Sequence, residues 1–264
     1  MADEPVLFDV SPEGLAVVRL NRPDKRNAFD ELTIQALADA FETLKGADHV
    51  RMVLVRGAGK HFSAGADLDW MQRQGTRDRA DNEADALDLA RMLKALHDLP
   101  QLTVALVQGA AMGGGAGLVA ACDVAVAMKD ASFRFSEVRL GLTPATISPY
   151  VVAAVGPRMA NALFATAESF DGAYAEKIGL TQYTVETEAE LDAMAEHLAT
   201  LAFAAAPGAV GDSKKLVRDV TGHKIDDALL RETARRIASR RASDEGKEGL
   251  AAFLEKRRPS WGAG

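Results

Sequence analysis

The segment Val107–Asp123, VQGAAMGGGAGLVAACD, sets the triplet Gly113–Gly115 between an apolar run, Leu102–Val107, and small apolar residues. The apolar run predicts a strand that is buried on both faces, as in a parallel sheet covered by helices on both sides. The glycines predict the start of a helix that continues through Gly117–Ala121. Free backbone N–H groups and the positive end of the helix dipole at such a start favour a negatively charged group.

The spacing of these glycines disfavours two common phosphate-binding loops. No Gly-Lys-Ser/Thr follows the triplet, and the G-x-G-x-x-G spacing of dinucleotide-binding folds is absent. Stabilisation of a developing oxyanion fits better, because two N–H groups held about 3 Å from the oxygen contribute several kcal/mol in a dry site. Close packing of the helix on the strand is the alternative that needs no ligand.

A second segment of small residues, Ser63–Asp67 (SAGAD), follows a strand expected over Val50–Val55. Small side chains let a ligand approach the backbone closely and accept hydrogen bonds from its N–H groups. An ordinary turn with Asp67 as a helix cap explains the same residues without a ligand. Taken together, Ser63–Asp67 and Met112–Gly117 predict an oxyanion hole.

Glu137, within Phe135–Leu142 (FSEVRLGL), is the candidate general acid or base. Its apolar neighbours and the following turn at Gly141–Pro144 predict partial burial. Burial raises the pKa of a carboxyl group toward the range that is useful for proton transfer. A surface glutamate paired with Arg139 is the competing interpretation.

Strands alternate with helices through about residue 140, which is typical of an α/β protein. The other strands expected in this part are Leu15–Leu20 and Val124–Ala127, and the helices are Phe29–Leu44, between an Asp30 N-cap and Gly46, and Ala84–Leu96. From Ser148 onward Ala-rich helical stretches dominate, over Val151–Ala154, Met159–Ala165, Gly172–Ile178, Glu188–Ala206 and Ile225–Lys256.

Composition and charge restrict the class of protein. The 264 residues carry a formal net charge of -7, which disfavours nucleic-acid and anionic membrane partners. Cys122 is the single cysteine, so no intrachain disulfide is possible. No signal-peptide pattern, membrane-span-length apolar run or metal-ligand spacing of histidines is present. We therefore expect a soluble cytoplasmic protein with no metal, no nucleic-acid partner and no membrane partner.

Four segments in order resemble the enoyl-CoA hydratase/isomerase family, also called the crotonase superfamily. They are Asn21–Phe29 (NRPDKRNAF), His61–Met71 (HFSAGADLDWM), Val107–Asp123 and Phe135–Pro144 (FSEVRLGLTP), and Glu248–Trp261 (EGLAAFLEKRRPSW) extends the resemblance over nearly the whole chain. The resemblance implies an α/β core, residues 1–200, built as a spiral of ββα units. It further implies a C-terminal helical region, residues 201–264, that forms a homotrimer or a dimer of trimers.

The same resemblance implies an acyl-CoA substrate, with coenzyme A as part of the substrate and no separate cofactor. By motif matching, the N–H groups of Ala66 and Gly114 bind the thioester oxygen of an enolate, and Glu137 moves the proton. Lys25 and Arg26 match positions near the CoA phosphates or adenine, and Phe253 and Lys256 match positions that reach a neighbouring subunit's CoA. The remaining positions expected to contact substrate are Ala28, Ala64, Asp67, Leu68, Met112, Gly113, Gly115, Gly117 and Thr143.

Gly117 departs from the pattern of well-known hydratases of the family, which carry a second glutamate there. Glycine cannot orient or deprotonate water, so either Glu137 acts alone or another polar group assists. Asp69 is one candidate for that group, and Thr143, Thr146 and Ser148 could supply neutral donors or serve only as turn and cap residues.

The segments HFSAGADLDWM and FSEVRLGLTPATISPYVV resemble the methylglutaconyl-CoA and isohexenylglutaconyl-CoA hydratase branch, which serves leucine and acyclic terpene breakdown. Substrates of that branch carry a second carboxylate. We therefore interpret the chain as a hydratase of a branched, carboxylated 2-enoyl-CoA such as 3-methylglutaconyl-CoA. A Δ3,Δ2-enoyl-CoA isomerase with Glu137 as its single base is the alternative enzyme, and a CoA-binding scaffold is the alternative without catalysis.

Overall fold

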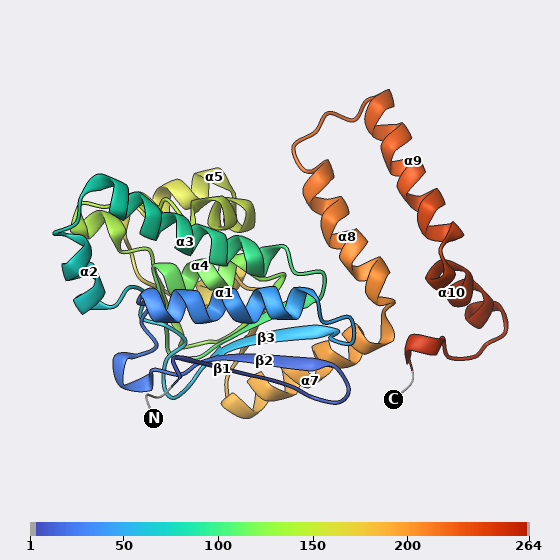
Figure 1. The fold of residues 1–264 in the computed structure, drawn as a ribbon, viewed down its shortest axis with the longest axis horizontal. Coiled ribbons are helices and arrows are strands. Elements are labelled where there is room, and N and C mark those ends of the chain that lie inside the picture. The colour runs from blue at the N-terminus through green and yellow to red at the C-terminus, as the bar shows by residue number, and fades with distance from the viewer. Residues whose placement is uncertain (1–3, 263–264) are drawn as a thin grey trace.

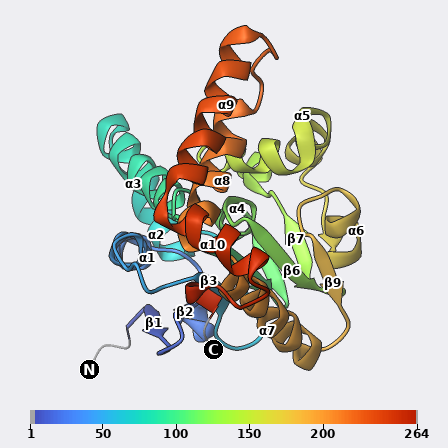
Figure 2. The same cartoon turned by 90° about the vertical axis from the view of Figure 1, so that its right-hand side faces the viewer.

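The computed structural model describes residues 4–262. Residues 1–3 of the predicted core and residues 263–264 of the predicted C-terminal region lie outside the described residues. Figure 1 shows a core of helices packed on a sheet, from which three C-terminal helices project. Figure 2 shows the same projection from the side, with α9 and α10 in front of the core.

A six-stranded sheet forms the centre of the core, in the order β1-β2-β3-β4-β6-β9. Only β1 runs antiparallel to its neighbour, and every other pair is parallel. The strands are β1 (Val6–Val10), β2 (Leu15–Leu20), β3 (Met52–Gly57), β4 (Leu102–Val107), β6 (Val124–Met128) and β9 (Tyr183–Val185). A second sheet has the order β5-β7-β8 and consists of β5 (Ala110–Met112), β7 (Ser132–Arg134) and β8 (Phe170–Asp171).

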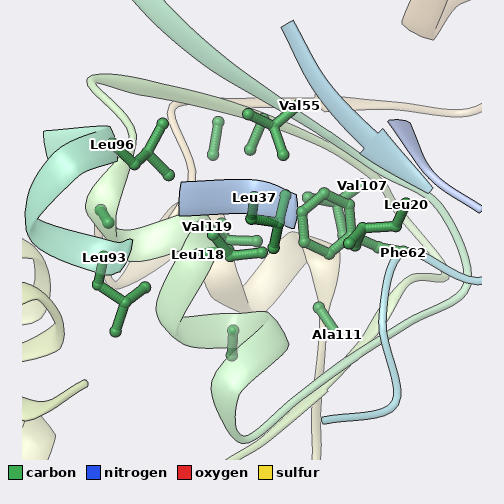
Figure 3. Packing of buried hydrophobic residues seen from close by; sticks show 14 of the residues in the cluster. Leu20, Leu37, Val55, Phe62, Leu93, Leu96, Val107, Ala111, Leu118 and Val119 are labelled. Carbon is green, nitrogen blue, oxygen red and sulfur yellow. The ribbon is translucent and has the colours of Figure 1, made fainter. Parts of the chain in front are cut away.

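Helices cover both faces of the larger sheet. The helices of the core are α1 (Glu31–Lys45), α2 (Leu68–Gln74), α3 (Arg79–His97), α4 (Gly114–Ala121), α5 (Ser148–Thr166), α6 (Gly172–Lys177) and α7 (Glu188–Ala204). Alternate residues of β3 belong to two separate apolar clusters, because successive side chains of a strand point to opposite faces. Val53 and Val55 belong to the cluster that includes residues of α1, α3 and α4, whereas Met52 and Leu54 pack with α7. Figure 3 shows the first cluster, with Leu37 and Leu118 near its centre and Leu93 and Leu96 to one side.

Several elements confirm the sequence predictions closely. The strands Leu15–Leu20 and Leu102–Val107 have the predicted bounds, and β4 lies in the sheet interior with all but its first residue buried. Asp30 caps α1 by accepting from the Thr33 N–H at 2.9 Å, and Gly46 ends that helix.

Other elements differ from the predictions. Helix α3 begins at Arg79, five residues before the predicted Ala84. The first turn of the helix is polar, so apolar residues at helical spacing do not mark its start. Helix α5 joins two predicted stretches across a break at Gly156. The predicted helix Glu188–Ala206 ends at Ala204, and Pro207 starts a further helix that was not predicted.

The projecting C-terminal part consists of α8 (Pro207–Val220), α9 (Asp227–Ala242) and α10 (Asp244–Leu254). In Figure 1, α8 leads away from the core and α9 runs back toward α10. Residue 200, the boundary expected from the sequence, lies inside α7, whereas the projection starts at α8. The described part of the chain also has three short 3-10 helices: η1 (Pro23–Lys25), η2 (Glu137–Leu140) and η3 (Ser260–Gly262). None of the helices within residues 4–262 has the length and apolar character of a membrane span.

Lys214 and Arg51 are among the cationic side chains that join the C-terminal part to the core. Lys214 on α8 forms an ion pair with Asp123 at 2.6 Å and donates to the Gln101 carbonyl at 2.7 Å. Arg51, just before β3, donates to the carbonyls of Ala202 at 3.2 Å and Trp261 at 3.3 Å, and also to that of Ala205. The carbonyls of Ala202 and Ala205 lie at the C-terminal end of α7, where the negative end of the helix dipole favours a cation.

Replacing Arg51 by alanine is expected to lower the free energy of unfolding by roughly 2 kcal/mol, because hydrogen bonds to a charged group are lost and carbonyls are left without a donor. Urea denaturation measures this change. Arg91→Ala is the matched control, because Arg91 is exposed and its ion pair, with Asp88, lies within its own helix, and it should cost less than about 0.5 kcal/mol. Equal losses in the two variants would show that Arg51 does not fasten the C-terminal part.

Candidate active site

The two segments of small residues lie against each other in the structure. Ser63 N–H donates to the Ala110 carbonyl at 2.9 Å, and Met112 N–H donates to the Ser63 carbonyl at 2.9 Å. Gly65 allows this approach, because a Cβ atom there would lie 2.9 Å from the Met112 carbonyl oxygen. Its φ of 89° is also one that side chains disfavour.

Phe29, the last residue of the motif Asn21–Phe29, contacts both segments. Phe29 N–H donates to the Gly65 carbonyl at 2.7 Å, and its own carbonyl accepts from the Asp67 N–H at 2.7 Å. The phenyl ring packs beside Gly114, where a Cβ atom would lie 3.2 Å from ring carbons. One buried aromatic residue therefore fixes the backbone of both halves of the site.

The N–H groups of Ala66 and Gly114 remain available, while their neighbours are used within the chain. Gly65 N–H donates to Ser63 Oγ, Asp67 N–H to Phe29 and Gly113 N–H to the Arg134 carbonyl. Within residues 4–262, neither Ala66 N–H nor Gly114 N–H has an acceptor. Gly114 is the first residue of α4, so its N–H also lies at the positive end of a helix dipole.

Pairing between β5 and β7 brings Glu137 to these N–H groups. Met112 is in register with Arg134, and Glu137 starts η2 three residues later. A Cβ atom at Gly113 would lie 3.1 Å from Glu137 Oε1, so the carboxyl group rests directly over the glycine triplet. The predicted acid or base and the predicted oxyanion hole are thus adjacent.

The environment of Glu137 suits a proton donor. Burial raises the pKa of its carboxyl group above the ordinary value, because the charged form loses water. Its Oε2 is buried and has no hydrogen-bond partner among the described residues. The structure does not favour the alternative of a surface pair with Arg139, because Glu137 is half-buried and its Oε2 has no partner among the described residues.

Gly117 is packed against Ile147, a residue that sequence reasoning missed. A Cβ atom at Gly117 would lie 2.2 Å from Ile147 Cγ2 and 2.8 Å from Ile147 Cβ. Ile147 stands just before α5 and is only 2% exposed. The position at which a second glutamate was considered is therefore filled by an aliphatic side chain. A glycine inside a helix signals close packing, but the sequence does not show which residue packs there.

The residues expected along the CoA path gather around the start of α2. Ala64 N–H donates to the Arg26 carbonyl at 2.9 Å, and exposed Lys25 pairs with Asp69 at 3.2 Å. Leu68 is 81% exposed, whereas Ala28 is buried. Lys25, Arg26, Ala64 and Leu68 thus lie at one edge of the site.

Asp67 has a structural role in the chain. It caps α2 by accepting from the N–H groups of Asp69 and Trp70, and it pairs with Arg22 at 3.0 Å. Burial raises the pKa of the Asp67 carboxyl group, but the two N–H groups and Arg22 lower it by more. The pKa of Asp67 is therefore below its ordinary value. Arg22 also pairs with Asp30 at 2.9 Å, so it joins α1 to α2. Sequence reasoning named Asp67 and Asp30 but missed this arginine.

The remaining predicted residues divide between this site and a distant part of the chain. Gly115 packs on Ser63, Met112 is half-buried on β5, and Thr143 is exposed shortly after η2. Ser148 Oγ donates to the Ala145 carbonyl at 2.8 Å, which agrees with its alternative role as a turn residue. Phe253 and Lys256 lie on and just after α10, on the far side of the core from α2 in Figure 1. One chain therefore does not bring Phe253 and Lys256 to its own site.

Comparison with known proteins identifies the family. The enoyl-CoA hydratase/isomerase family model matches residues 11–264. The chain therefore belongs to the enoyl-CoA hydratase/isomerase family and is an enzyme of the crotonase superfamily.

Individual relatives agree with this family. The chain is 32% identical to the crotonyl-CoA hydratase of Syntrophomonas wolfei, over 99% of both chains. It is 41% identical to a solved enoyl-CoA hydratase from Shewanella pealeana, with a TM-score of 0.94 over 97% of this chain and 96% of that one. It is 34% identical to Pseudomonas aeruginosa AtuE, with a TM-score of 0.94 over 98% of this chain and 100% of that one. The predicted crotonase-like α/β fold with C-terminal helices is confirmed.

Gly117→Ala is expected to lower the free energy of unfolding by about 1–3 kcal/mol, because the added methyl group overlaps Ile147. The double variant Gly117→Ala/Ile147→Ala should lose less than the sum of the single losses, as measured by urea denaturation. Gly46→Ala is the control, since its nearest atom would lie 3.9 Å away. Additive losses would show that the two side chains do not compete for the same space.

Glu137→Gln is expected to raise the melting temperature at neutral pH but not at pH 4. The raised pKa of Glu137 means that ionisation is less favourable in the folded chain than in the unfolded chain. The wild type therefore loses stability as pH rises above the unfolded pKa, while the neutral amide does not. Thermal melts of both proteins from pH 4 to 8 test this, and a constant difference across that range would contradict it.

Proposed function

We propose that the chain hydrates a 2-enoyl-CoA thioester, with Ala66, Gly114 and Glu137 as its catalytic groups. The single observation that carries this proposal is the pair of unused backbone N–H groups with the Glu137 carboxyl group beside them. Water adds to the β-carbon, and negative charge develops on the thioester oxygen. The two N–H groups bind that oxygen more strongly as its charge grows, which lowers the barrier.

Glu137 then delivers a proton to the α-carbon of the enolate. The direction of its pKa shift supports this assignment, because burial disfavours the charged form and so favours a carboxyl group with a proton to donate. Its position over Gly113 supports a role at the carbon that adjoins the bound oxygen. Hydration thus uses one protein carboxyl group together with backbone N–H groups.

The CoA portion is proposed to lie along Lys25, Arg26, Ala28, Ala64 and Leu68. Lys25 and Arg26 are exposed cations at the edge of the site and suit phosphate groups. Met112, Gly113, Gly115, Gly117 and Thr143 would line or shape the acyl end. Phe253 and Lys256 of a neighbouring copy would complete the CoA site in a homotrimer or a dimer of trimers.

The acyl group is proposed to be branched and to carry a second carboxylate, as in 3-methylglutaconyl-CoA. Support comes from the likeness of His61–Met71 and Phe135–Val152 to the glutaconyl-CoA hydratase branch. It also comes from Gly117, since a site without a second protein carboxylate suits an anionic acyl group better.

The filled position beside Gly117 also favours a second candidate, a Δ3,Δ2-enoyl-CoA isomerase. Moving a double bond requires one base that carries a proton between two carbons, and Glu137 is such a group. Hydration adds the mass of one water to the substrate, whereas isomerisation leaves the mass unchanged.

Incubation with 3-methylglutaconyl-CoA, and separately with a 3-enoyl-CoA, tests the proposal by mass spectrometry of the products. We expect a gain of one water mass with the first substrate, and Glu137→Gln should lower kcat by about 10²–10⁴-fold. Glu168→Gln is the control, because Glu168 is an exposed glutamate outside the site, and its kcat should be unchanged. A shifted double bond without added mass would favour the isomerase, and undiminished turnover in Glu137→Gln would favour a different catalytic group.

A further inference from the structure

The hydrogen bonds between the two site segments change their pattern at His61. Ser63 N–H donates to the Ala110 carbonyl and Met112 N–H to the Ser63 carbonyl, each at 2.9 Å, as in a pair of parallel strands. One step back in this pattern, the Ala110 N–H would donate to the main-chain carbonyl of His61. It donates instead to Nδ1 of the His61 imidazole, at 3.2 Å. A side chain thus takes the place of a backbone acceptor.

The main-chain carbonyl of His61 is engaged elsewhere. It accepts from Asn27 Nδ2 at 2.7 Å, and the same amide group donates to the Ala58 carbonyl at 2.9 Å. Asn27 is only 1% exposed, and its own carbonyl accepts from Ser63 Oγ at 2.8 Å. A polar group buried to this extent needs its partners. Donors on Asn27 and Ala110 therefore both require an acceptor on residue 61, and the imidazole lets that residue serve both.

Gly109 makes room for the imidazole ring. A Cβ atom at Gly109 would lie 2.7 Å from His61 Nδ1, and its φ of 63° is one that side chains disfavour. Accepting through Nδ1 requires the neutral ring with its proton on Nε2. The backbone of one segment is thus shaped to receive a side chain of the other.

We propose that His61 is a positioning residue for the oxyanion hole, an inference that rests on the proposed function. Without the imidazole, the acceptor for the Ala110 N–H in this pattern would be the His61 carbonyl, which would have to leave Asn27. That exchange would move the backbone directly before Ser63. The imidazole therefore keeps Ser63 in register with the other segment of the site.

Register matters here because two N–H groups must reach one oxygen. Ala66 follows Ser63 by three residues, and Gly114 follows Met112 by two. A shift at Ser63 would move the Ala66 N–H relative to the Gly114 N–H. Misplacement by about 1 Å, even by a change far from the reacting atoms, can lower a rate by about 10²-fold. The loss would appear mainly in kcat, since the charge on the oxygen is greatest in the transition state.

Two substitutions of nearly equal size separate the acceptor from the bulk of the ring. His61→Asn keeps an amide oxygen close to the position of Nδ1, whereas His61→Leu fills a similar volume without an acceptor. For 3-methylglutaconyl-CoA, His61→Leu should lower kcat by about 10–10²-fold with little change in KM. His61→Asn should retain most of the wild-type kcat. His49→Leu is the control, because His49 is an exposed histidine outside the site, and both constants should be unchanged.

A spectroscopic measurement reports on the oxyanion hole without turnover. Butyryl-CoA labelled with ¹³C at the thioester carbonyl is saturated, so it cannot be hydrated. Hydrogen bonds to that carbonyl lower its stretching frequency, which infrared difference spectroscopy measures in the bound state. We expect a smaller lowering with His61→Leu than with the wild type, and a nearly wild-type lowering with His61→Asn.

The outcomes separate positioning from a purely structural role. Unchanged kcat and carbonyl frequency in His61→Leu would overturn the inference even if its melting temperature fell, because His61 would then stabilise only the fold. Equal losses in His61→Leu and His61→Asn would also overturn it, since the acceptor would not matter. A wild type that lowers the carbonyl frequency but hydrates no thioester would contradict the proposed function, and the frequencies of the two variants would still decide the inference.

Discussion

The site depends on the backbone hydrogen bonds that join Ser63 to Ala110 and Met112. These bonds hold two segments, nearly 50 residues apart in the sequence, side by side. Gly65 permits the approach, and Phe29 contacts both segments, through its backbone at Gly65 and Asp67 and through its ring at Gly114. Because the contacts are backbone to backbone, the geometry resists change in the surrounding side chains. A binding site built in this way needs little reorganisation when charge develops.

The sequence predicted the parts of the site that are encoded locally. The glycine triplet, the small residues of Ser63–Asp67 and Glu137 all stood out by composition and spacing, and the structure brings them together. The strands Leu15–Leu20 and Leu102–Val107 were also predictable, because their β-branched and apolar runs have clear ends.

Features that depend on distant residues were not predictable. Ile147 fills the space over Gly117, and nothing in either local sequence shows that contact. The short strands β5 and β7 lack a hydrophobic pattern of their own and exist because they pair with each other. Helix α2 follows the Asp67 cap and contains polar residues that lack helical periodicity. A single sequence shows propensities, whereas these elements form through tertiary contacts.

Arg51 has a consequence for the order in which the chain folds. It binds the carbonyl of Trp261, 210 residues away, and the carbonyls at the end of α7. During synthesis the parallel core strands emerge first, whereas the contact with Trp261 must wait until that residue has been made. Contacts of such long range form late, because ordering the intervening chain costs entropy before the contact can stabilise it. The core can therefore assemble early, and docking of the C-terminal part is the step that completes the fold.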